Sequence, residues 1–449
     1  MNNLYKFTGV IALLLTMFAG NVSAQSTLFN RDLQYFRYND QRGLNVFETT
    51  KSDTVGFDGV KVRVGGDFAL QMQGLQHSNT MGNLQDIHTN VNLPTANLRI
   101  DAQLADGVRV NLLTYLSSRH HNDTWVMGGY LQVDNLNFLN LNSQLADDIM
   151  DIVTIKVGQM EVNYGDQHFR RTDNAYTMGN AFIGNTIMDA FATEMAMEVY
   201  AQKNGFIGMF GLSNGALNQG VTHTGNWSVY GKVGYDKQVN DDLRVRLTGS
   251  YYHNSNLDNS NIYAGDRAGS RFYNVMVPTG DDFRSGRANP NFTNNIDAVM
   301  LNSFVKFRGL EFFGTYENSQ GLSKGEAMEN NPEMSNRTWE QLAGELIYRF
   351  GNQEQFNVGA RYNTAWGTNA AEAGAFEDGT AWSIGQQDVR QNRYELSAGW
   401  FMTKNVSLKG SYIKQTYDDY DNYLGTGSTN ANFAGGQFDG FMLEAAISF

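Results

Sequence analysis

Residues 60–73 read VKVRVGGDFALQMQ and carry the pattern from which the fold is predicted. Its even positions, from Val60 to Met72, are apolar or glycine, whereas most of its odd positions, from Lys61 to Gln73, are polar or charged. A period of two places alternate side chains on opposite faces of a β-strand. This strand is much longer than the usual soluble strand of about 5–6 residues. It therefore indicates a strand that crosses a membrane with one apolar face.

The same alternation continues along the chain. Apolar residues at the even positions from Leu98 to Leu104 alternate with polar ones, residues 105–107 (ADG) form a turn, and the alternation resumes at Val108. This pattern predicts a hairpin of two long strands. Extending the count predicts sixteen strands. They lie near 60–73, 91–104, 108–118, 125–138, 151–163, 191–202, 206–213, 226–238, 242–253, 296–307, 310–318, 338–350, 355–366, 389–402, 405–417 and 437–449.

The connections between these strands alternate in length. Short ones, such as residues 203–205 and 403–404, alternate with long ones, such as residues 254–295. An even number of strands with short periplasmic turns and long extracellular loops is typical of a closed antiparallel transmembrane β-barrel. We therefore predict an all-β fold with the barrel spanning residues 59–449. One connection, near 139–150, is longer than a periplasmic turn should be.

The composition agrees with a membrane barrel. The 449 residues include no cysteine, 4 prolines and 47 glycines, and only 18% are charged, against about 25% in ordinary soluble domains. Without cysteine there is neither a disulfide framework nor a cysteine-ligated metal site. The net charge of −13 and the lack of a basic cluster disfavour nucleic-acid binding. No catalytic motif is present, so we expect no enzyme, no cofactor and no metal.

Aromatic residues make up 12% of the chain, and many fall near the predicted strand ends. Transmembrane barrels carry aromatic girdles at both membrane interfaces. The candidates for these girdles are Trp125, Phe138, Trp227, Tyr235, Trp339, Phe350, Trp366, Trp400 and Tyr417.

The first 24 residues have the pattern of a secretory signal peptide. Lys6 precedes an apolar run at 10–19, and small residues at 22–24 suit cleavage. Residues 25–58 then precede the barrel. They could form a periplasmic arm, a plug in the lumen or a contact with a neighbouring subunit, and the sequence does not choose among these.

The last strand, residues 441–449 (FMLEAAISF), alternates apolar and polar positions and ends in Phe449. It resembles the C-terminal strand of Gram-negative outer-membrane proteins. With sixteen strands, the chain resembles the sixteen-stranded porins, both general and phosphate-selective. Residues 157–165 and 169–174 are similar to segments of phosphate-selective porins and of porin-like proteins of the Bacteroidetes, respectively. The resemblance implies that the barrel-assembly machinery reads Phe449, that lipopolysaccharide surrounds the barrel, and that the protein forms a homotrimer.

In porins of this type the third long loop folds into the lumen and forms the constriction. The resemblance implies that residues 164–190 do so here. The candidate constriction residues are Asp166, His168, Arg170, Arg171, Asp173 and Asp189. The strand alternation independently predicts charged residues on the lumen wall. These are Arg63, Arg99, Arg109, Arg244, Arg246, Arg361, Arg393, Glu194 and Glu198.

Opposed charges across a narrow gap would create a transverse field favouring small polar solutes. Alternatively, the wall charges are simply a hydrated face, and Arg170 and Arg171 pair with Asp166 or Asp173 to hold the loop in shape. We predict an outer-membrane porin for passive diffusion of ions and small hydrophilic solutes.

The alternative is a plugged barrel that serves as a structural or binding partner in the envelope, with residues 254–295 and 418–436 as contact surfaces. The solute, the ion preference, the open or plugged state, the oligomeric state and the strand count within 14–18 remain open.

Overall fold

The computed structural model describes residues 32–53, 55–117, 121–171, 176–216, 226–255, 260–263, 272–328 and 336–449 of the chain. The predicted signal peptide at 1–24 and the candidate residue Asp173 lie outside these ranges. In the described ranges, no helix is both long and apolar enough to cross a membrane.

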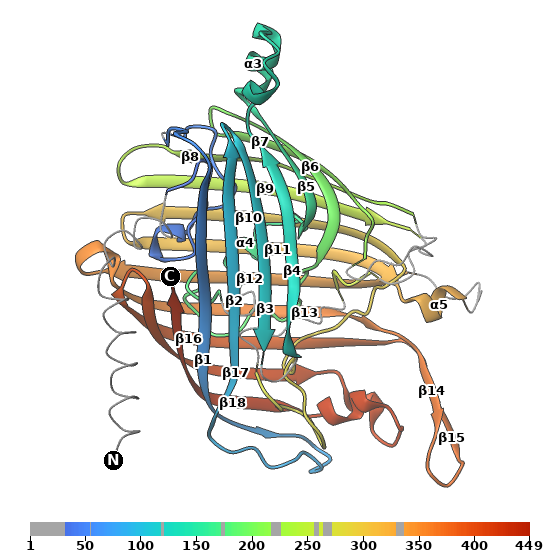
Figure 1. The fold of residues 1–449 in the computed structure, drawn as a ribbon. Coiled ribbons are helices and arrows are strands. Elements are labelled where there is room, and N and C mark those ends of the chain that lie inside the picture. The colour runs from blue at the N-terminus through green and yellow to red at the C-terminus, as the bar shows by residue number, and fades with distance from the viewer. Residues whose placement is uncertain are drawn as a thin grey trace, which may run out of the picture.

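Sixteen antiparallel strands form one closed barrel, in which each strand pairs with its neighbours in the order β1-β18-β17-β16-β13-β12-β11-β10-β9-β8-β7-β6-β5-β4-β3-β2 (Figure 1). The prediction of a closed sixteen-stranded barrel is confirmed. The strands of the barrel are β1 Lys61–Ser78, β2 Asn90–Ala105, β3 Val108–Ser117, β4 His121–Val133, β5 Val153–Glu161, β6 Thr193–Lys203, β7 Phe206–Ser213, β8 Ser228–Gln238, β9 Leu243–Asn254, β10 Asn295–Phe307, β11 Leu310–Leu322, β12 Arg337–Phe350, β13 Phe356–Asn369, β16 Gln387–Thr403, β17 Val406–Asp418 and β18 Gln437–Ser448.

The barrel closes where the first and last strands meet. β1 pairs with β18 in a register that runs from Asp67 opposite Ser448 to Ser78 opposite Gln437. The chain end continues this pairing, because the Phe449 amide donates to the Gly66 carbonyl at 2.9 Å. No strand edge is left open there, which is what hydrocarbon requires of a spanning sheet.

Two connections between barrel strands contain secondary structure that the sequence did not predict. Between β13 and β16, β14 (Glu372–Ala375) and β15 (Ala381–Ile384) form a separate hairpin that extends the long-loop end of the barrel. Between β4 and β5, the 3-10 helix η2 (Asn137–Leu139) and helix α3 (Gln144–Met150) replace a tight turn. The remaining helical segments are η1 Gln41–Gly43, α4 Gln167–Arg170, α5 Lys324–Met328, η3 Asn352–Glu354, η4 Asp421–Tyr423 and η5 Thr429–Phe433.

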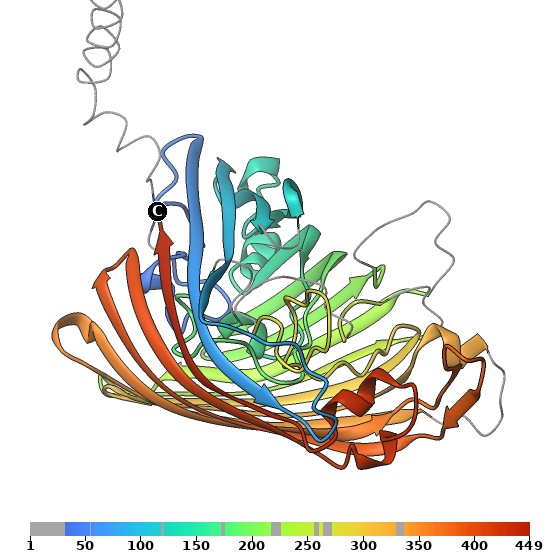
Figure 2. The same ribbon diagram turned by 90° about the horizontal axis from the view of Figure 1, so that it is seen from below.

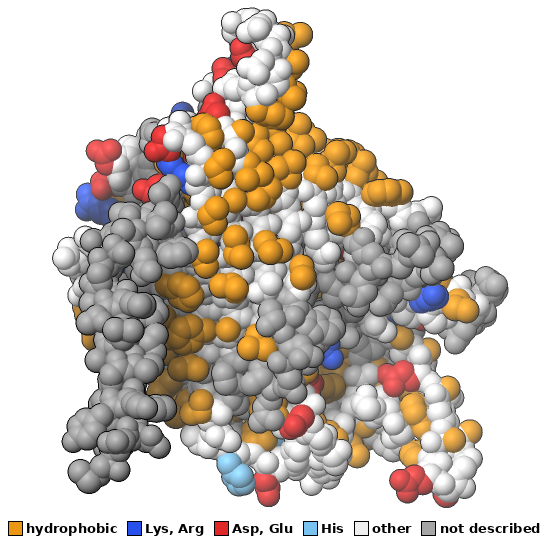
Figure 3. Space-filling model, in the orientation of Figure 1, with side chains coloured by type: hydrophobic (Ala, Val, Ile, Leu, Met, Phe, Trp, Pro, Cys, Tyr) orange, Lys and Arg blue, Asp and Glu red, His pale blue; other side chains and the backbone are white. Residues whose placement is uncertain are grey.

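The outer face of the barrel is apolar, as the alternation predicts, and Figure 3 shows hydrophobic side chains spread over the face viewed there. At the short-turn end, exposed and half-buried aromatic rings form a row from strand to strand. Their centroids are separated by 5.8 Å for Tyr348 and Phe350, 5.6 Å for Phe350 and Phe356, and 6.2 Å for Phe356 and Trp400. Such a row suits one membrane interface.

The girdle prediction is wrong for Trp339 and Tyr417. Both lie on inward-facing positions of their strands and are buried, 1% and 3% exposed. Tyr417 stacks on Phe433 inside the barrel, with ring centroids 4.8 Å apart. The reason is that strand parity, not nearness to a strand end, decides which side of the sheet a ring occupies.

The interior of the barrel is not empty. Figure 2 shows chain segments inside the ring of strands. Residues 32–53 and 55–58 lie near the short-turn end, the described parts of the β5–β6 connection (162–171 and 176–192) fold inward, and parts of 260–292 and 419–436 pack above them. The last three segments contribute buried apolar side chains such as Ile187, Phe272 and Tyr423 to one core cluster.

Candidate functional site

A buried cluster of four charges joins two inner segments to the barrel wall. Lys232 of β8 lies 3.1 Å from Glu48 and 3.0 Å from Asp166. Arg246 of β9 lies 2.7 Å from each of the same two carboxylates. All four side chains are almost fully buried. Two cations and two anions balance, so the cluster holds the N-terminal segment and the β5–β6 connection against the wall without a net buried charge.

The two carboxylates of this cluster are held in their ionised form. Burial acts to raise the pKa of Asp166, but Lys232 and Arg246 outweigh it and hold that pKa below its ordinary value. The same balance lowers the pKa of Glu48. Both carboxylates therefore stay ionised at neutral and mildly acidic pH.

His168 is held next to this cluster. Its Nε2 lies 2.9 Å from Oδ1 of Asn163, and its Nδ1 lies 3.6 Å from Glu161. Burial lowers the pKa of His168, so the ring is neutral at pH 7. The Asn163 oxygen also accepts from Lys232. The imidazole is thus one member of a polar network.

The two arginines of the connection bind carboxylates. Arg170 donates to Oδ1 of Asn45 at 2.7 Å and to Glu345 of β12 at 3.2 Å. Nε of Arg171 lies 2.9 Å from both carboxylate oxygens of Asp189. Arg170 therefore ties the connection to the wall and to the N-terminal segment, and Arg171 ties its two halves together.

The middle of the β5–β6 connection, residues 177–188, is bound by the wall through its main chain. Nζ of Lys409 donates to the carbonyls of Thr177, Asn180 and Phe182 at 2.8–3.0 Å. Further wall side chains bind main-chain atoms of residues 183–188. They are Glu395 on Ile183, Arg361 on Gly184, Arg393 on Asn185, Asn363 on Ile187 and Gln341 on Met188. Together β12, β13, β16 and β17 hold this segment inside the barrel against their part of the wall.

Residues 32–53 cross the short-turn end and bind turns around the barrel. Nε2 of Gln34 donates to Asp106 at 2.9 Å, and Nζ of Lys51 donates to the carbonyl of Asp134 at 2.7 Å. On other sides, Arg244 donates to the Asn45 carbonyl at 2.9 Å and the Gln41 amide donates to the Lys404 carbonyl at 2.9 Å. These bonds hold the segment across the mouth of the barrel.

The remaining wall residues are placed as follows. Arg63 stacks on Phe36 and Tyr38; Arg99 lies 3.8 Å from Asp67; Arg109 binds Asp101 at 2.8 Å; Arg244 binds Asp236 at 2.7 Å; Arg361 binds Glu395 at 2.5 Å; Arg393 binds Gln415 at 2.7 Å; Glu194 accepts from Ser213; Glu198 accepts from Tyr230 at 2.9 Å. All nine predicted wall residues point inward, but they do not form one site. Arg361 and Arg393 lie under the inward-folded segment.

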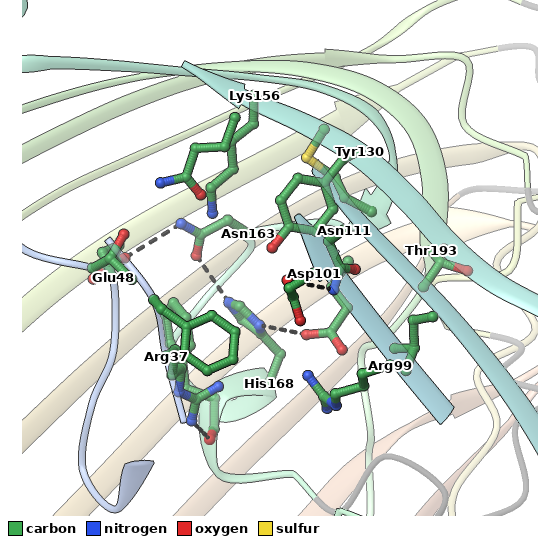
Figure 4. A pocket seen from close by; sticks show the side chains of 18 of the residues that line it. Arg37, Glu48, Arg99, Asp101, Asn111, Tyr130, Lys156, Asn163, His168 and Thr193 are labelled. Atoms are coloured by element: carbon green, nitrogen blue, oxygen red, sulfur yellow. Dashed lines mark hydrogen bonds and ion pairs between the residues drawn. The ribbon is translucent and has the colours of Figure 1, made fainter. Parts of the chain in front are cut away.

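A cavity of about 160 Å³ remains between the inner segments and the wall formed by β2 to β6. In Figure 4, Tyr130, Asn111 and Arg99 of the wall face Arg37 and Glu48 of the N-terminal segment across this space. The rings of Tyr130 and Tyr200 lie 5.6 and 4.9 Å from the Lys156 ammonium. Among the described residues, no carboxylate lies within ion-pairing distance of that ammonium.

Sequence reasoning did not single out Glu48, Lys156 or Lys409. Strand parity could have found the two lysines, because Lys156 and Lys409 occupy inward positions of β5 and β17. No sequence signal points to Glu48, since residues 25–58 carry no periodic pattern.

The closed sheet, the apolar outer face and the polar inner face define an outer-membrane β-barrel of Gram-negative type. No family model and no curated protein sequence matches the chain. Among solved structures, the anion-selective porin from Comamonas acidovorans is similar with a TM-score of 0.50 at 11% identity, over 87% of this chain and 100% of that porin.

OmpF of Salmonella typhi and the outer membrane channel DcaP of Acinetobacter baumannii match with TM-scores of 0.47, at 11% and 10% identity, over 88% of this chain and 99% of theirs. At these identities the likeness concerns the fold alone. The chain has the fold of the sixteen-stranded porins.

Proposed function

We propose that the protein is a narrow outer-membrane channel through which small hydrophilic solutes diffuse along the wall of β2 to β6. The cavity beside Tyr130 and Lys156 carries this proposal, because it is a space lined by polar and charged side chains between the wall and the inner segments. The β5–β6 connection and residues 32–53 would together form the constriction. This assignment is supported by the ion pairs and hydrogen bonds that hold both segments inside the barrel.

Lys156 provides the sharpest test. A charge that lacks an ion-pair partner in a narrow, poorly screened passage acts strongly on a passing ion, whereas a charge on the exposed surface is screened by salt. We expect Lys156→Glu to shift the reversal potential in a planar bilayer toward cation preference. Lys203→Glu makes the same charge change on an exposed residue at the β6–β7 turn and should leave the reversal potential unchanged. Equal reversal potentials in both variants and the wild type would contradict the proposed route.

A second function is favoured by the burial of polar side chains on the wall formed by β12, β13 and β17. Gln341, Asn363 and Gln415 face the interior and are 0% exposed, which is unlike the wall of a wide aqueous pore. A fully plugged barrel would serve as a structural or binding partner in the envelope. Bilayers containing the wild-type protein would then carry no current above the lipid background at any applied voltage.

A further inference from the structure

The connection between β4 and β5 departs from the short-turn rule in a specific way. Its neighbours at this end are tight, such as the two residues 204–205 between β6 and β7. Residues 134–152 instead build η2 and α3, and Figure 1 shows α3 projecting beyond the ends of the strands. Little of the surface of this projection (residues 134–152) is buried against the rest of the protein, since Met150 is its only buried hydrophobic side chain.

The projection exposes large apolar side chains. Leu145 is 70% exposed and Ile149, one helical turn later, is 47% exposed. Leu139 and Leu141, just before the helix, are 50% and 54% exposed. Leu145 and Ile149 are four residues apart in α3 and therefore share one helix face. Figure 3 shows apolar side chains running along one side of the projection, so this surface is an apolar strip and not a set of scattered residues.

The projection is also acidic. Asp147, Asp148 and Asp151 are exposed, and residues 134–152 contain no lysine or arginine. Asp147 and Asp151 are four residues apart and share a side of the helix away from Leu145, whereas Asp148, three residues after Leu145, borders the apolar strip. Figure 3 shows the apolar side chains of the projection on the side that continues the apolar surface of the barrel, with acidic side chains on the other side. At its base, Leu131 of β4 and Val157 of β5 are paired and face outward, 38% and 45% exposed.

We propose that residues 137–151 form an interfacial anchor that lies on the periplasmic leaflet of the outer membrane. The apolar strip of Leu139, Leu141, Leu145 and Ile149 would rest at the boundary between headgroups and acyl chains. Asp147 and Asp151 would face the periplasm, and Asp148 would lie at the edge of the strip, at the level of the headgroups. An amphipathic segment binds a lipid surface in this manner. A helix of seven residues is marginal in water on its own, and burying its apolar face in lipid stabilises it.

The occupant is lipid because the strip continues the lipid-facing band of the barrel without a break. The segment also has no cationic side chain that could pair with its three aspartates, so its membrane affinity must come from apolar burial. This predicts a preference for zwitterionic over anionic lipid, since like charges repel at the membrane surface.

The absence of cysteine makes the test direct, because a single introduced cysteine carries a unique label. We would attach a nitroxide to Leu145→Cys in the full-length protein, reconstituted in phosphatidylcholine vesicles. Asp147→Cys labels the acidic side of the same helix, and Leu131→Cys is the lipid-exposed reference. We expect collisions with oxygen to exceed those with a water-soluble nickel chelate at Leu145→Cys and Leu131→Cys, and the reverse at Asp147→Cys.

Adding phosphatidylglycerol should shift the label at Leu145→Cys toward the aqueous pattern while leaving Leu131→Cys unchanged. An aqueous pattern at Leu145→Cys in phosphatidylcholine would overturn the proposal. Protection from both reagents, with dipolar broadening between labels, would also overturn it, because a second copy of the chain would then cover the strip. Heat-modifiable migration on gels establishes that each labelled variant has folded into the barrel.

Discussion

At the residue scale, the interior of this barrel is organised by buried ions that each bind more than one segment. Lys232 contacts Glu48 and Asp166, which are far apart in sequence, and Lys409 gathers three carbonyls of one segment. A buried cation without partners is costly, so such a residue selects the one arrangement that satisfies it. The inner segments are therefore held in specific positions.

Removing Lys232 should destabilise the protein strongly. Lys232→Met leaves Glu48 and Asp166 sharing Arg246 alone, and breaking a buried ion pair costs about 3–5 kcal/mol. We expect a lower midpoint in urea unfolding. Lys237→Met removes an exposed lysine from the same strand and should change the midpoint little. Equal midpoints for the two variants would mean that the cluster contributes no stability.

His168 should make stability depend on pH. Its pKa is lowered in the folded protein, whereas the unfolded chain has the ordinary value of about 6.5. The unfolded chain therefore binds the proton more readily, and stability falls as the pH drops through about 6.5 toward the folded pKa. Urea unfolding at pH 7.5 and pH 5.5 would measure this loss. His168→Gln should show a smaller loss than the wild type, and an identical loss would argue against a buried neutral His168.

At the element scale, the two faces of each strand have different roles. Their outward residues are apolar wherever lipid is the neighbour, and their inward residues bind the segments that lie inside. β12, β13, β16 and β17 use side chains to bind main-chain groups of residues 177–188. Because main-chain groups are bound, the position of this segment depends on the wall residues more than on the segment's own side chains.

Loosening this segment should change the current. Lys409→Met removes the donor for three carbonyls and the partner of Glu444, which lies 2.9 Å away. Since each unsatisfied buried polar group costs about 1–3 kcal/mol, we expect the segment to detach part of the time. Single-channel records should then show a higher open-state conductance or added fluctuation. Lys414→Met, which changes an exposed residue of the same strand, is the control.

At the scale of the whole molecule, the protein is a barrel whose lumen is largely filled from both ends. Residues 32–53 cover the short-turn end, and the β5–β6 connection, with parts of 260–292 and 419–436, fills the middle and the long-loop end. The barrel itself closes through β1 and β18 and does not need the N-terminal segment for that pairing.

Deleting residues 25–58 while keeping the predicted signal peptide should therefore leave a folded barrel with a wider passage. We expect larger conductance and faster swelling of liposomes in sugars that the full-length protein excludes. If the truncated barrel folds, as judged by heat-modifiable migration, and its conductance equals that of the full chain, the N-terminal segment does not obstruct the lumen.

Much of the fold could be predicted from the sequence, because a spanning strand must present alternating side chains to lipid and to the interior. The period of two in residues 60–73 and the alternation of connection lengths predicted a closed barrel of about sixteen strands, with 14–18 left open. The same parity determined that Arg63 and Arg361 point inward. The girdle prediction was wrong for Trp339 and Tyr417, because it used nearness to a strand end instead of strand parity.

The tertiary structure alone decided what the inward residues bind. Glu48 meets Lys232 and Asp166 only because the barrel brings three distant segments together, and no local pattern encodes such a meeting. The barrel could be predicted from the sequence, since lipid imposes one repeating constraint on every strand. The filled lumen and the narrow space beside β2 to β6 depend on contacts between residues far apart in the chain, and only the folded molecule specifies those.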